Sequence, residues 1–251
     1  KSFNQPLIAW DVSEVTSFYS AFYYAESFNQ PLSAWDVSKV ANSNFHNMFY
    51  NAKNMYQILC SPAWDAKKEA TALSFQGSKS KVLCCDPGSF LQLARTDSAC
   101  VACVPGRFQN ESKYAQATTC RRCAEGSFQE DSSSTSCLDC PKGYHQQNKE
   151  KPFCFPCVPG KYQHRFGQPQ CNECEAGRFN ANVNATTACE PCLDGTYSAS
   201  GAASCTSCPR GMFGRNALGQ PNRTAACQNC SAGYYSAARA STFQDGCTPC
   251  S

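Results

Sequence analysis

The chain has 251 residues, a formal net charge of +3 and 21 cysteines. Its acidic and basic residues are interspersed, which argues against a nucleic-acid-binding protein because such proteins concentrate basic side chains on one face. No apolar run approaches the length that spans a membrane. The cysteine content is typical of a disulfide scaffold made in an oxidising compartment, so we expect an extracellular or cell-surface protein.

The first 65 residues contain a repeat with a period of 25 residues. The phrase Ser2-Phe-Asn-Gln-Pro-Leu7 returns as Ser27-Phe-Asn-Gln-Pro-Leu32, and Ala9-Trp-Asp-Val-Ser13 returns as Ala34-Trp-Asp-Val-Ser38. A degenerate third copy contains Ala63-Trp-Asp65. Repeats of this length are typical of a solenoid, in which successive units bury a shared core.

Each repeat is expected to form a turn and short strand followed by a short helix. The segment from Phe3 to Val12 has few helix formers and carries a proline, which favours turn plus strand. From Val15 to Ala25, apolar residues recur at three and four positions, as on one face of a helix. The sequence therefore predicts a short leucine-rich-repeat-like α/β solenoid over residues 1–65.

The phrases of this array, together with Asn47-Met-Phe49, resemble the BspA-type repeats, a leucine-rich-repeat-like class of bacterial and protist surface proteins. The resemblance implies a place on a cell surface. Because Lys1 falls inside a repeat, we expect the chain to begin within a larger array. Asn4 and Asn29 are expected to bond turn backbone, as asparagine ladders do in leucine-rich repeats.

Other side chains of the array also recur in register. We expect the tryptophans to form the solenoid core, with stacking on sugars as the alternative: Trp10, Trp35 and Trp64. We expect the aspartates to close turns through Asx hydrogen bonds, with calcium binding as the alternative: Asp11, Asp36 and Asp65. A further set of aromatics exceeds what a thin core needs and favours a protein contact surface: Tyr19, Tyr23, Tyr24, Phe45, Phe49 and Tyr50.

Residues 66–84 are expected to form a cap and junction. The segment is basic, and a solvated surface is the simplest interpretation of its lysines: Lys67, Lys68, Lys79 and Lys81.

Residues 85–251 are predicted to be a tandem array of small cysteine-rich modules, spaced at roughly 17 to 20 residues. The C-x-x-C pairs are Cys100/Cys103, Cys120/Cys123, Cys137/Cys140, Cys154/Cys157, Cys171/Cys174, Cys189/Cys192, Cys205/Cys208, Cys227/Cys230 and Cys247/Cys250. A glycine and an aromatic follow the second cysteine, as in Cys157-Val-Pro-Gly-Lys-Tyr162. The glycine permits a positive φ where the chain turns back, and the ring is expected to cover the crosslink. One module differs from this pattern, because in Cys140-Pro-Lys-Gly-Tyr-His145 the aromatic residue comes one position early.

The simplest connectivity joins the second cysteine of one pair to the first of the next. It gives Cys60-Cys84, Cys85-Cys100, Cys103-Cys120, Cys123-Cys137, Cys140-Cys154, Cys157-Cys171, Cys174-Cys189, Cys192-Cys205, Cys208-Cys227 and Cys230-Cys247. Cys250 is left over, and we expect its partner to lie beyond Ser251. Sequence alone does not prove this ladder.

Zinc is the main alternative, because C-x-x-C pairs are also metal-site spacing. A four-cysteine zinc site takes two C-x-x-C pairs, so nine pairs cannot all be used in such sites. The spacing between pairs also varies more than repeated tetrahedral sites would allow. Sequons for N-glycosylation add an extracellular mark and predict glycans at Asn110, Asn184, Asn222 and Asn229. We therefore expect disulfides and no metal site.

The recurring cysteine, glycine and aromatic resemble the ephrin-receptor-like cysteine-rich repeats, relatives in style of the tumour-necrosis-factor-receptor modules. The resemblance covers residues 84 to 251. It implies a receptor ectodomain or a long extracellular stalk, and an elongated rod of disulfide-rich tandem repeats preceded by the solenoid.

Nothing in the sequence favours an enzyme or a cofactor. The three histidines, His46, His145 and His164, lie in no metal or triad pattern, and no phosphate-binding loop is present. Two hypotheses remain. The first is a glycosylated structural protein of a surface filament or matrix, resembling the proteins that build mastigonemes on flagella, with other protein subunits as partners. The second is an adhesin or receptor ectodomain whose solenoid binds a protein or glycan.

Overall fold

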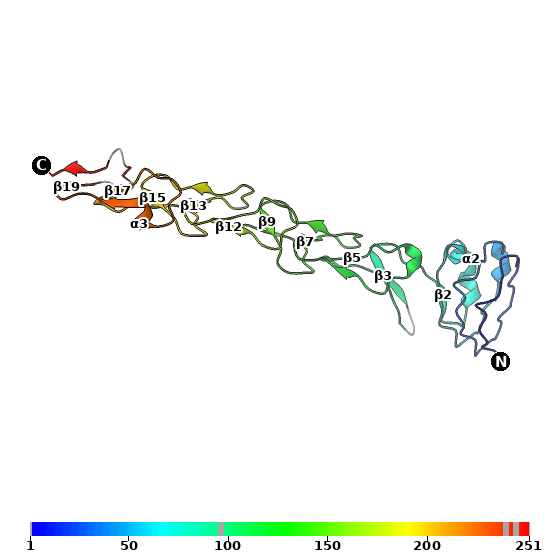
Figure 1. The fold of residues 1–251 in the computed structure, drawn as a ribbon. Helices are drawn as coiled ribbons and strands as arrows, with labels where there is room; N and C mark the ends of the chain where they lie inside the picture. Colours follow the sequence, from blue (N-terminus) through cyan, green and yellow to red (C-terminus); the bar gives the residue numbers. More distant parts are fainter. Residues whose placement is uncertain (1, 95–97, 238–240, 243–245, 251) are drawn as a thin grey trace. The chain divides into compact units, whose positions relative to one another are not determined.

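A computed structural model describes residues 2–94, 98–237, 241–242 and 246–250 (Figure 1). The chain divides into two compact units. The first comprises residues 1–121 and 131–136, and the second comprises residues 122–130 and 137–251.

The first unit begins with the 25-residue repeats and ends with the first cysteine-rich modules. Its elements are η1 (Asn42–Phe45), β1 (Ile58–Leu59), α1 (Pro62–Asp65), α2 (Lys68–Thr71), η2 (Ala72–Phe75), β2 (Lys81–Val82), β3 (Ser89–Gln92), β4 (Ala99–Ala102), β5 (Arg107–Phe108) and η3 (Lys113–Ala115). β1 and β2 pair in parallel, and β3 and β4 form an antiparallel hairpin. The α1 helix begins at Pro62 because the Ser61 hydroxyl caps the Trp64 amide and proline suits the first turn.

The helix expected from Val15 to Ala25 is wrong, as is the short strand expected from Phe3 to Val12. Residues 2–41 contain turns and extended chain, without helix or strand. Ser20 and Tyr24 have positive φ angles of 54° and 53°, which interrupt a right-handed helix at every fourth residue. The apolar spacing of three and four therefore arises from consecutive turns.

These turns bond to the next repeat instead of to themselves. The amide of Phe18 donates to Asn44 O at 3.0 Å, and the amide of Phe22 donates to Met48 O at 2.8 Å. Phenyl rings stack in the same direction, since Phe22 lies 5.3 Å from Phe49 and Phe49 lies 5.2 Å from Phe75 between ring centroids. The repeats therefore share one continuous apolar core.

The second unit is a series of two-stranded antiparallel hairpins. Its strands are β7 (Ser127–Phe128), β8 (Leu138–Asp139), β9 (Tyr144–His145), β10 (Phe155–Pro156), β11 (Lys161–Tyr162), β12 (Asn172–Glu173), β13 (Arg178–Phe179), β14 (Glu190–Pro191), β15 (Thr196–Tyr197), β16 (Thr206–Ser207), β17 (Met212–Gly214), β18 (Cys227–Asn229), β19 (Tyr234–Tyr235) and β20 (Thr248–Pro249). β6 (Arg121–Arg122) spans the division between the units, and α3 (Arg223–Ala226) precedes β18.

The C-x-x-C spacing explains these hairpins. Asn172 and Glu173, the two residues between Cys171 and Cys174, form β12, and the same holds for most other pairs. The opposite strand begins directly after the glycine that lies three residues past the second cysteine of a C-x-x-C pair, which we name the phrase glycine. This glycine has a positive φ in every module, for example 84° at Gly160. The prediction of a turn at this glycine is confirmed.

Consecutive modules are joined by backbone hydrogen bonds. The carbonyl of Cys140 accepts from the amide of Gly167 at 2.9 Å, and the carbonyl of Cys157 accepts from Asn184 at 2.8 Å. In the modules that contain Gly126, Gly143, Gly160 and Gly177, this glycine also reaches the module after next. A methyl group built on Gly143, for example, would lie 2.2 Å from the Asn184 carbonyl oxygen. These modules therefore contact their first and second neighbours, beyond the nearest-neighbour stacking that the repeat pattern suggested.

Candidate functional site

The structure brings together each cysteine pair that the sequence suggested. The disulfides are Cys60–Cys84, Cys85–Cys100, Cys103–Cys120, Cys123–Cys137, Cys140–Cys154, Cys157–Cys171, Cys174–Cys189, Cys192–Cys205, Cys208–Cys227 and Cys230–Cys247. Cys250 is exposed and has no partner among residues 1–251, so its pairing with a residue beyond Ser251 stays a prediction. In the central modules the cysteine that ends a C-x-x-C motif, such as Cys157, is fully buried. The cysteine that begins the motif, such as Cys171, is more exposed.

A buried polar side chain in seven of the nine modules was missed by sequence reasoning. It follows the aromatic position directly and occurs as Gln109, Gln129, Gln146, Gln163, Asn180, Ser198 and Ser236. Gln146 donates to Phe153 O at 2.7 Å and accepts from the Asn148 amide at 2.9 Å, so its amide spans the module loop. The rings before these residues are mostly half-buried. The interior of a module therefore consists of sulfur and a satisfied amide or hydroxyl more than of a ring.

The four sequon asparagines are exposed: Asn110, Asn184, Asn222 and Asn229. Asn222 caps α3 by accepting from the amide of Ala225 at 2.9 Å, and the Thr224 hydroxyl donates to the same oxygen. Asn184 sits at a positive φ of 51° in a module loop. The exposure of these side chains is compatible with glycans, whose occupancy stays a prediction.

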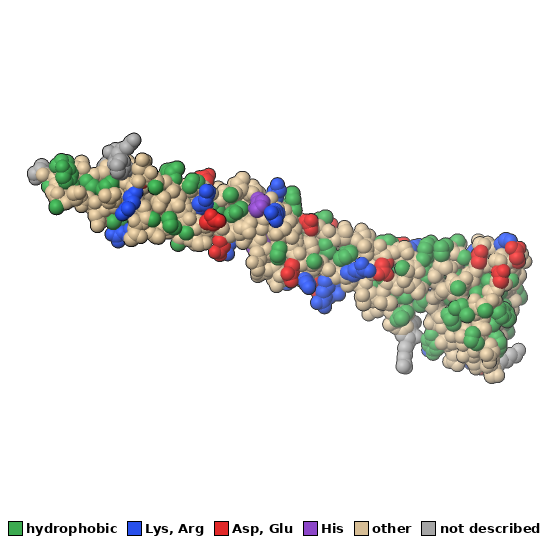
Figure 2. All heavy atoms as spheres, viewed as in Figure 1, with side chains coloured by type: hydrophobic (Ala, Val, Ile, Leu, Met, Phe, Trp, Pro, Cys, Tyr) green, Lys and Arg blue, Asp and Glu red, His purple; other side chains and the backbone are tan. Residues whose placement is uncertain are grey.

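Tyrosines line an outer part of the N-terminal repeats. We name the set Tyr19, Tyr23, Tyr24, Tyr50 and His46 the tyrosine surface. Tyr19 stacks on His46 and Tyr23 on Tyr50, with centroid distances of 5.8 and 5.4 Å. Figure 2 shows hydrophobic side chains gathered on the visible face of the N-terminal repeats. The prediction that Phe45 and Phe49 belong to a protein contact surface is wrong, because both side chains are fully buried in the core.

The three tryptophans do not behave alike. Trp35 and Trp64 are 3% and 0% exposed, and their indole N–H groups donate to Leu7 O and Leu32 O in the preceding repeat. Trp10 is 60% exposed, so its assignment to the core is wrong. It lines a hollow of about 490 Å³ with Phe3, Phe22 and other apolar side chains.

Asn4 and Asn29, the two asparagines expected to form a ladder, each accept a hydrogen bond from a backbone amide. Asn4 Oδ1 accepts from the Asn29 amide at 2.8 Å, and Asn29 Oδ1 accepts from the Tyr56 amide at 2.9 Å. Both bonds link one repeat to the next. The prediction that these side chains bond turn backbone is confirmed.

The aspartates form Asx turns in the first two repeats only. Asp11 accepts from the Ser13 amide, and Asp36 accepts from the Ser38 amide, both at 3.0 Å. Side-chain and then backbone hydrogen bonds from these serines lower the pKa of both carboxyl groups. Asp65 instead lies in α1 and pairs with Lys113 Nζ at 2.9 Å, a contact that raises the lysine pKa.

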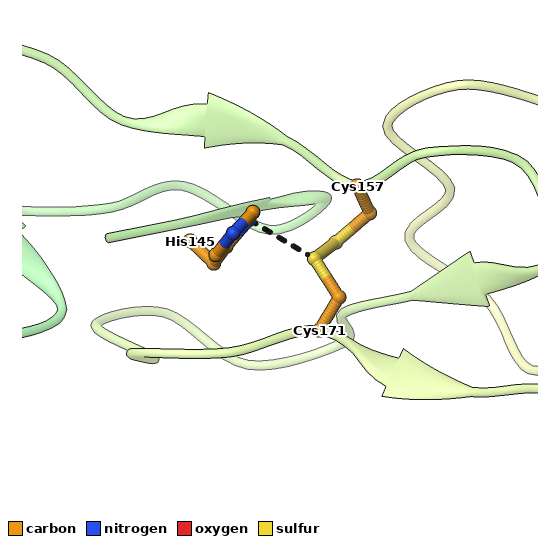
Figure 3. A group of neighbouring side chains, drawn as sticks. All are labelled: His145, Cys157 and Cys171. Atoms are coloured by element: carbon orange, nitrogen blue, oxygen red, sulfur yellow. Dashed lines mark hydrogen bonds between the residues drawn. A yellow bond between two sulfur atoms is a disulfide. The ribbon is translucent and has the colours of Figure 1, made fainter. Parts of the chain in front are cut away.

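One cluster has the residue types of a metal site. The ligand atoms of His145, Cys157 and Cys171 lie within 4.8 Å of one another (Figure 3). His145 Nδ1 is 3.2 Å from Cys171 Sγ. Both sulfurs are consumed by the Cys157–Cys171 disulfide, whereas cysteine binds a metal as a thiolate. The oxidised cluster therefore offers one imidazole and no thiolate.

Comparison with known proteins gives two matches. Residues 1–82 match the family described as Mycoplasma protein of unknown function, DUF285. Residues 112–152 and 143–188 match the family described as tyrosine-protein kinase ephrin type A/B receptor-like. No curated protein matches the chain. None of the helices in the described part of the chain has the length and apolar character of a membrane span.

The predicted similarity to ephrin-receptor-like repeats is thus confirmed for the middle of the cysteine-rich array. Such repeats and the disulfides indicate an extracellular or surface protein with a non-catalytic character. The BspA-type and leucine-rich-repeat resemblance of the first repeats stays a prediction, and the match there is to a family without a known function.

Proposed function

We propose that the chain is a non-enzymatic structural component of an extracellular assembly, a glycosylated, disulfide-crosslinked rod within a surface filament or matrix of the mastigoneme type. The observation that carries this proposal is the combination of one disulfide per module with backbone bonds between modules, such as Gly167 N to Cys140 O. A covalent loop in each module limits its extension under load, and the bonds between modules restrict bending. These properties suit a load-bearing element.

The partners in this proposal are other protein subunits, either copies of the chain or different chains. The tyrosine surface supports a lateral contact, because large amphipathic rings with few rotatable bonds are enriched in protein interfaces. Tyr19, Tyr23 and Tyr24 are 61%, 45% and 41% exposed. N-linked glycans at the sequons would keep the remaining faces hydrated.

An adhesin or receptor ectodomain is the second candidate. The hollow beside Trp10 favours it, since apolar walls next to the Asp11 carboxylate have the composition of a ligand site. In that case the cysteine-rich modules serve as a spacer and the N-terminal repeats bind the ligand.

Electron microscopy of the native protein, taken from its own cell surface without reductant, separates the two candidates. Regular filaments containing the chain are the expected result. Isolated molecules with unoccupied N-terminal repeats would overturn the structural proposal and direct a ligand search to the hollow beside Trp10.

A variant pair tests the tyrosine surface. Replacing Tyr23 and Tyr24 by serine should reduce assembly, measured by sedimentation of filaments. The control is Tyr114→Ser, which removes a ring of similar exposure, 42%, outside that surface. Equal sedimentation of both variants and the unaltered protein would exclude the tyrosines from the contact.

A further inference from the structure

One module differs from the others at its aromatic position. Five residues after the second cysteine, the other modules carry Phe or Tyr: Phe90, Phe108, Phe128, Tyr162, Phe179, Tyr197, Phe213 and Tyr235. His145 occupies this position in β9 and pairs in register with Phe155 of β10. The imidazole thus takes the place of an inert ring, with the same backbone around it.

His145 faces the disulfide of the next module. Figure 3 shows its ring edge directed at the sulfur of Cys171, and Nδ1 lies 3.2 Å from that atom. The Sγ of Cys157 is within 4.8 Å of the ligand atoms of the other two residues. A protonated imidazole at this position places a positive charge beside both sulfurs.

The disulfide is accessible from one side. Cys171 and His145 line a hollow of about 310 Å³ together with Gln147, Val158, Lys161 and Gln170. Cys157 is fully buried, whereas Cys171 is half-buried. The charge of Lys161 is offset by Glu173, whose carboxylate lies 3.0 Å away. His145 is therefore the group that the hollow presents to a thiolate approaching Cys171.

We propose that Cys157–Cys171 is a thiol–disulfide exchange site, at which the thiolate of a small thiol or of a protein cysteine attacks Cys171 Sγ. A sulfur–sulfur bond forms between the incoming thiolate and Cys171, and the bond between Cys171 and Cys157 breaks. The electron pair leaves with Cys157 Sγ as a thiolate, whose negative charge is stabilised by the His145 imidazolium within 4.8 Å. The products are a mixed disulfide at Cys171 and a Cys157 thiolate beside the imidazolium.

The chemistry of exchange favours this site over the other crosslinks. Exchange is faster when the departing sulfur is a better leaving group, and a neighbouring imidazolium stabilises a thiolate. The disulfide Cys140–Cys154 offers the comparison. Its cysteines have the same pattern of exposure, but the module before it carries Phe128 at the aromatic position. A phenyl ring supplies no positive charge.

The test uses the full oxidised chain and reduced glutathione as the thiol. Cys250 is first blocked with N-ethylmaleimide, so that the free thiol of the chain starts no exchange. Samples are quenched at intervals, new thiols are alkylated, and adducts are located by peptide mass spectrometry. We expect the glutathione adduct at Cys171, with Cys157 released, about tenfold faster than an adduct at Cys154.

Variants assign the effect to the imidazole. His145→Phe restores the side-chain type of the other modules and should lower the rate at Cys171 to that at Cys154, as should His145→Asn, which keeps polarity without the charge. His164→Phe is the control, since His164 is exposed and stacks on Tyr162. Equal rates at the two disulfides in the unaltered chain, an adduct at Cys157, or an undiminished rate in both His145 variants would overturn the proposal.

Discussion

Replacing Gly143 by alanine should destabilise the cysteine-rich array through a clash between modules. Gly143 has a φ of 81°, and its new methyl group would lie 2.2 Å from the Asn184 carbonyl oxygen and 2.8 Å from the carbonyl carbon. Both are backbone atoms, so no side chain can rotate away. The left-handed conformation costs about 1–2 kcal/mol for alanine, and the overpacking adds about 1–3 kcal/mol.

Gly211→Ala is the matched control. Gly211 has nearly the same φ, 84°, but nothing lies within 4 Å of the position that its new methyl group would take, so this variant should lose the conformational contribution alone. Hydrogen–deuterium exchange of the full chain, with peptides resolved around Asn184, measures the local free energy of opening. Since 1.4 kcal/mol is a factor of ten, a loss of about 2 kcal/mol or more for Gly143→Ala lowers protection about 30-fold or more.

The contrast between the two glycines decides the outcome. If Gly143→Ala lowers protection near Asn184 no more than Gly211→Ala lowers it around its own position, the contact between second-neighbour modules contributes nothing to stability. The backbone ladder would then be limited to adjacent modules.

Three further predictions concern single side chains. Trp64→Ala should cost about 3–5 kcal/mol in the unfolding of the N-terminal repeats, measured by denaturant titration followed by tryptophan fluorescence, whereas Trp10→Ala should change stability by less than about 0.5 kcal/mol. Gln146→Ala should cost about 1–3 kcal/mol because it leaves the Phe153 carbonyl unpaired, and increased amide exchange in that module loop alone would report it. For Asp36, hydrogen bonds from Ser38 lower the carboxyl pKa in the folded chain. Its stabilising contribution is therefore complete above the ordinary value of 3.8 and is lost as the pH falls through the lowered pKa, so Asp36→Asn should flatten the acid limb of a stability–pH curve.

The sequence predicted the cysteine-rich modules better than the N-terminal repeats, for a physical reason. The C-x-x-C pairs and the glycine of each phrase fix a crosslink, a hairpin and a positive φ locally, so spacing alone determines most of a module. In the repeats, an apolar spacing of three and four fits a helix and a run of turns equally well. The positive φ angles of residues such as Ser20 and Tyr24 exclude the helix and produce the turns. Neither serine nor tyrosine is a residue type that predicts a positive φ.

Two aspects of the candidate sites needed the structure. The polar residue that follows most of the aromatic positions, such as Gln146, recurs in register in the sequence, but its burial depends on a carbonyl at the far end of the loop. In the sequence, His145 stands out only as a departure from the aromatic pattern. Its proximity to Cys171 comes from the stacking of one module on the next, which residue spacing does not specify.

The contact of the phrase glycine with the second-neighbour module has a consequence for how such arrays lengthen. A module inserted by duplication must fit four others, two on each side, because Gly126 approaches Gly167 as Gly160 approaches Gly201. Whole blocks of at least five modules are therefore easier to copy than single ones, since such a block contains a module with its complete set of contacts. A break in the array likewise leaves two incomplete modules on either side of the gap.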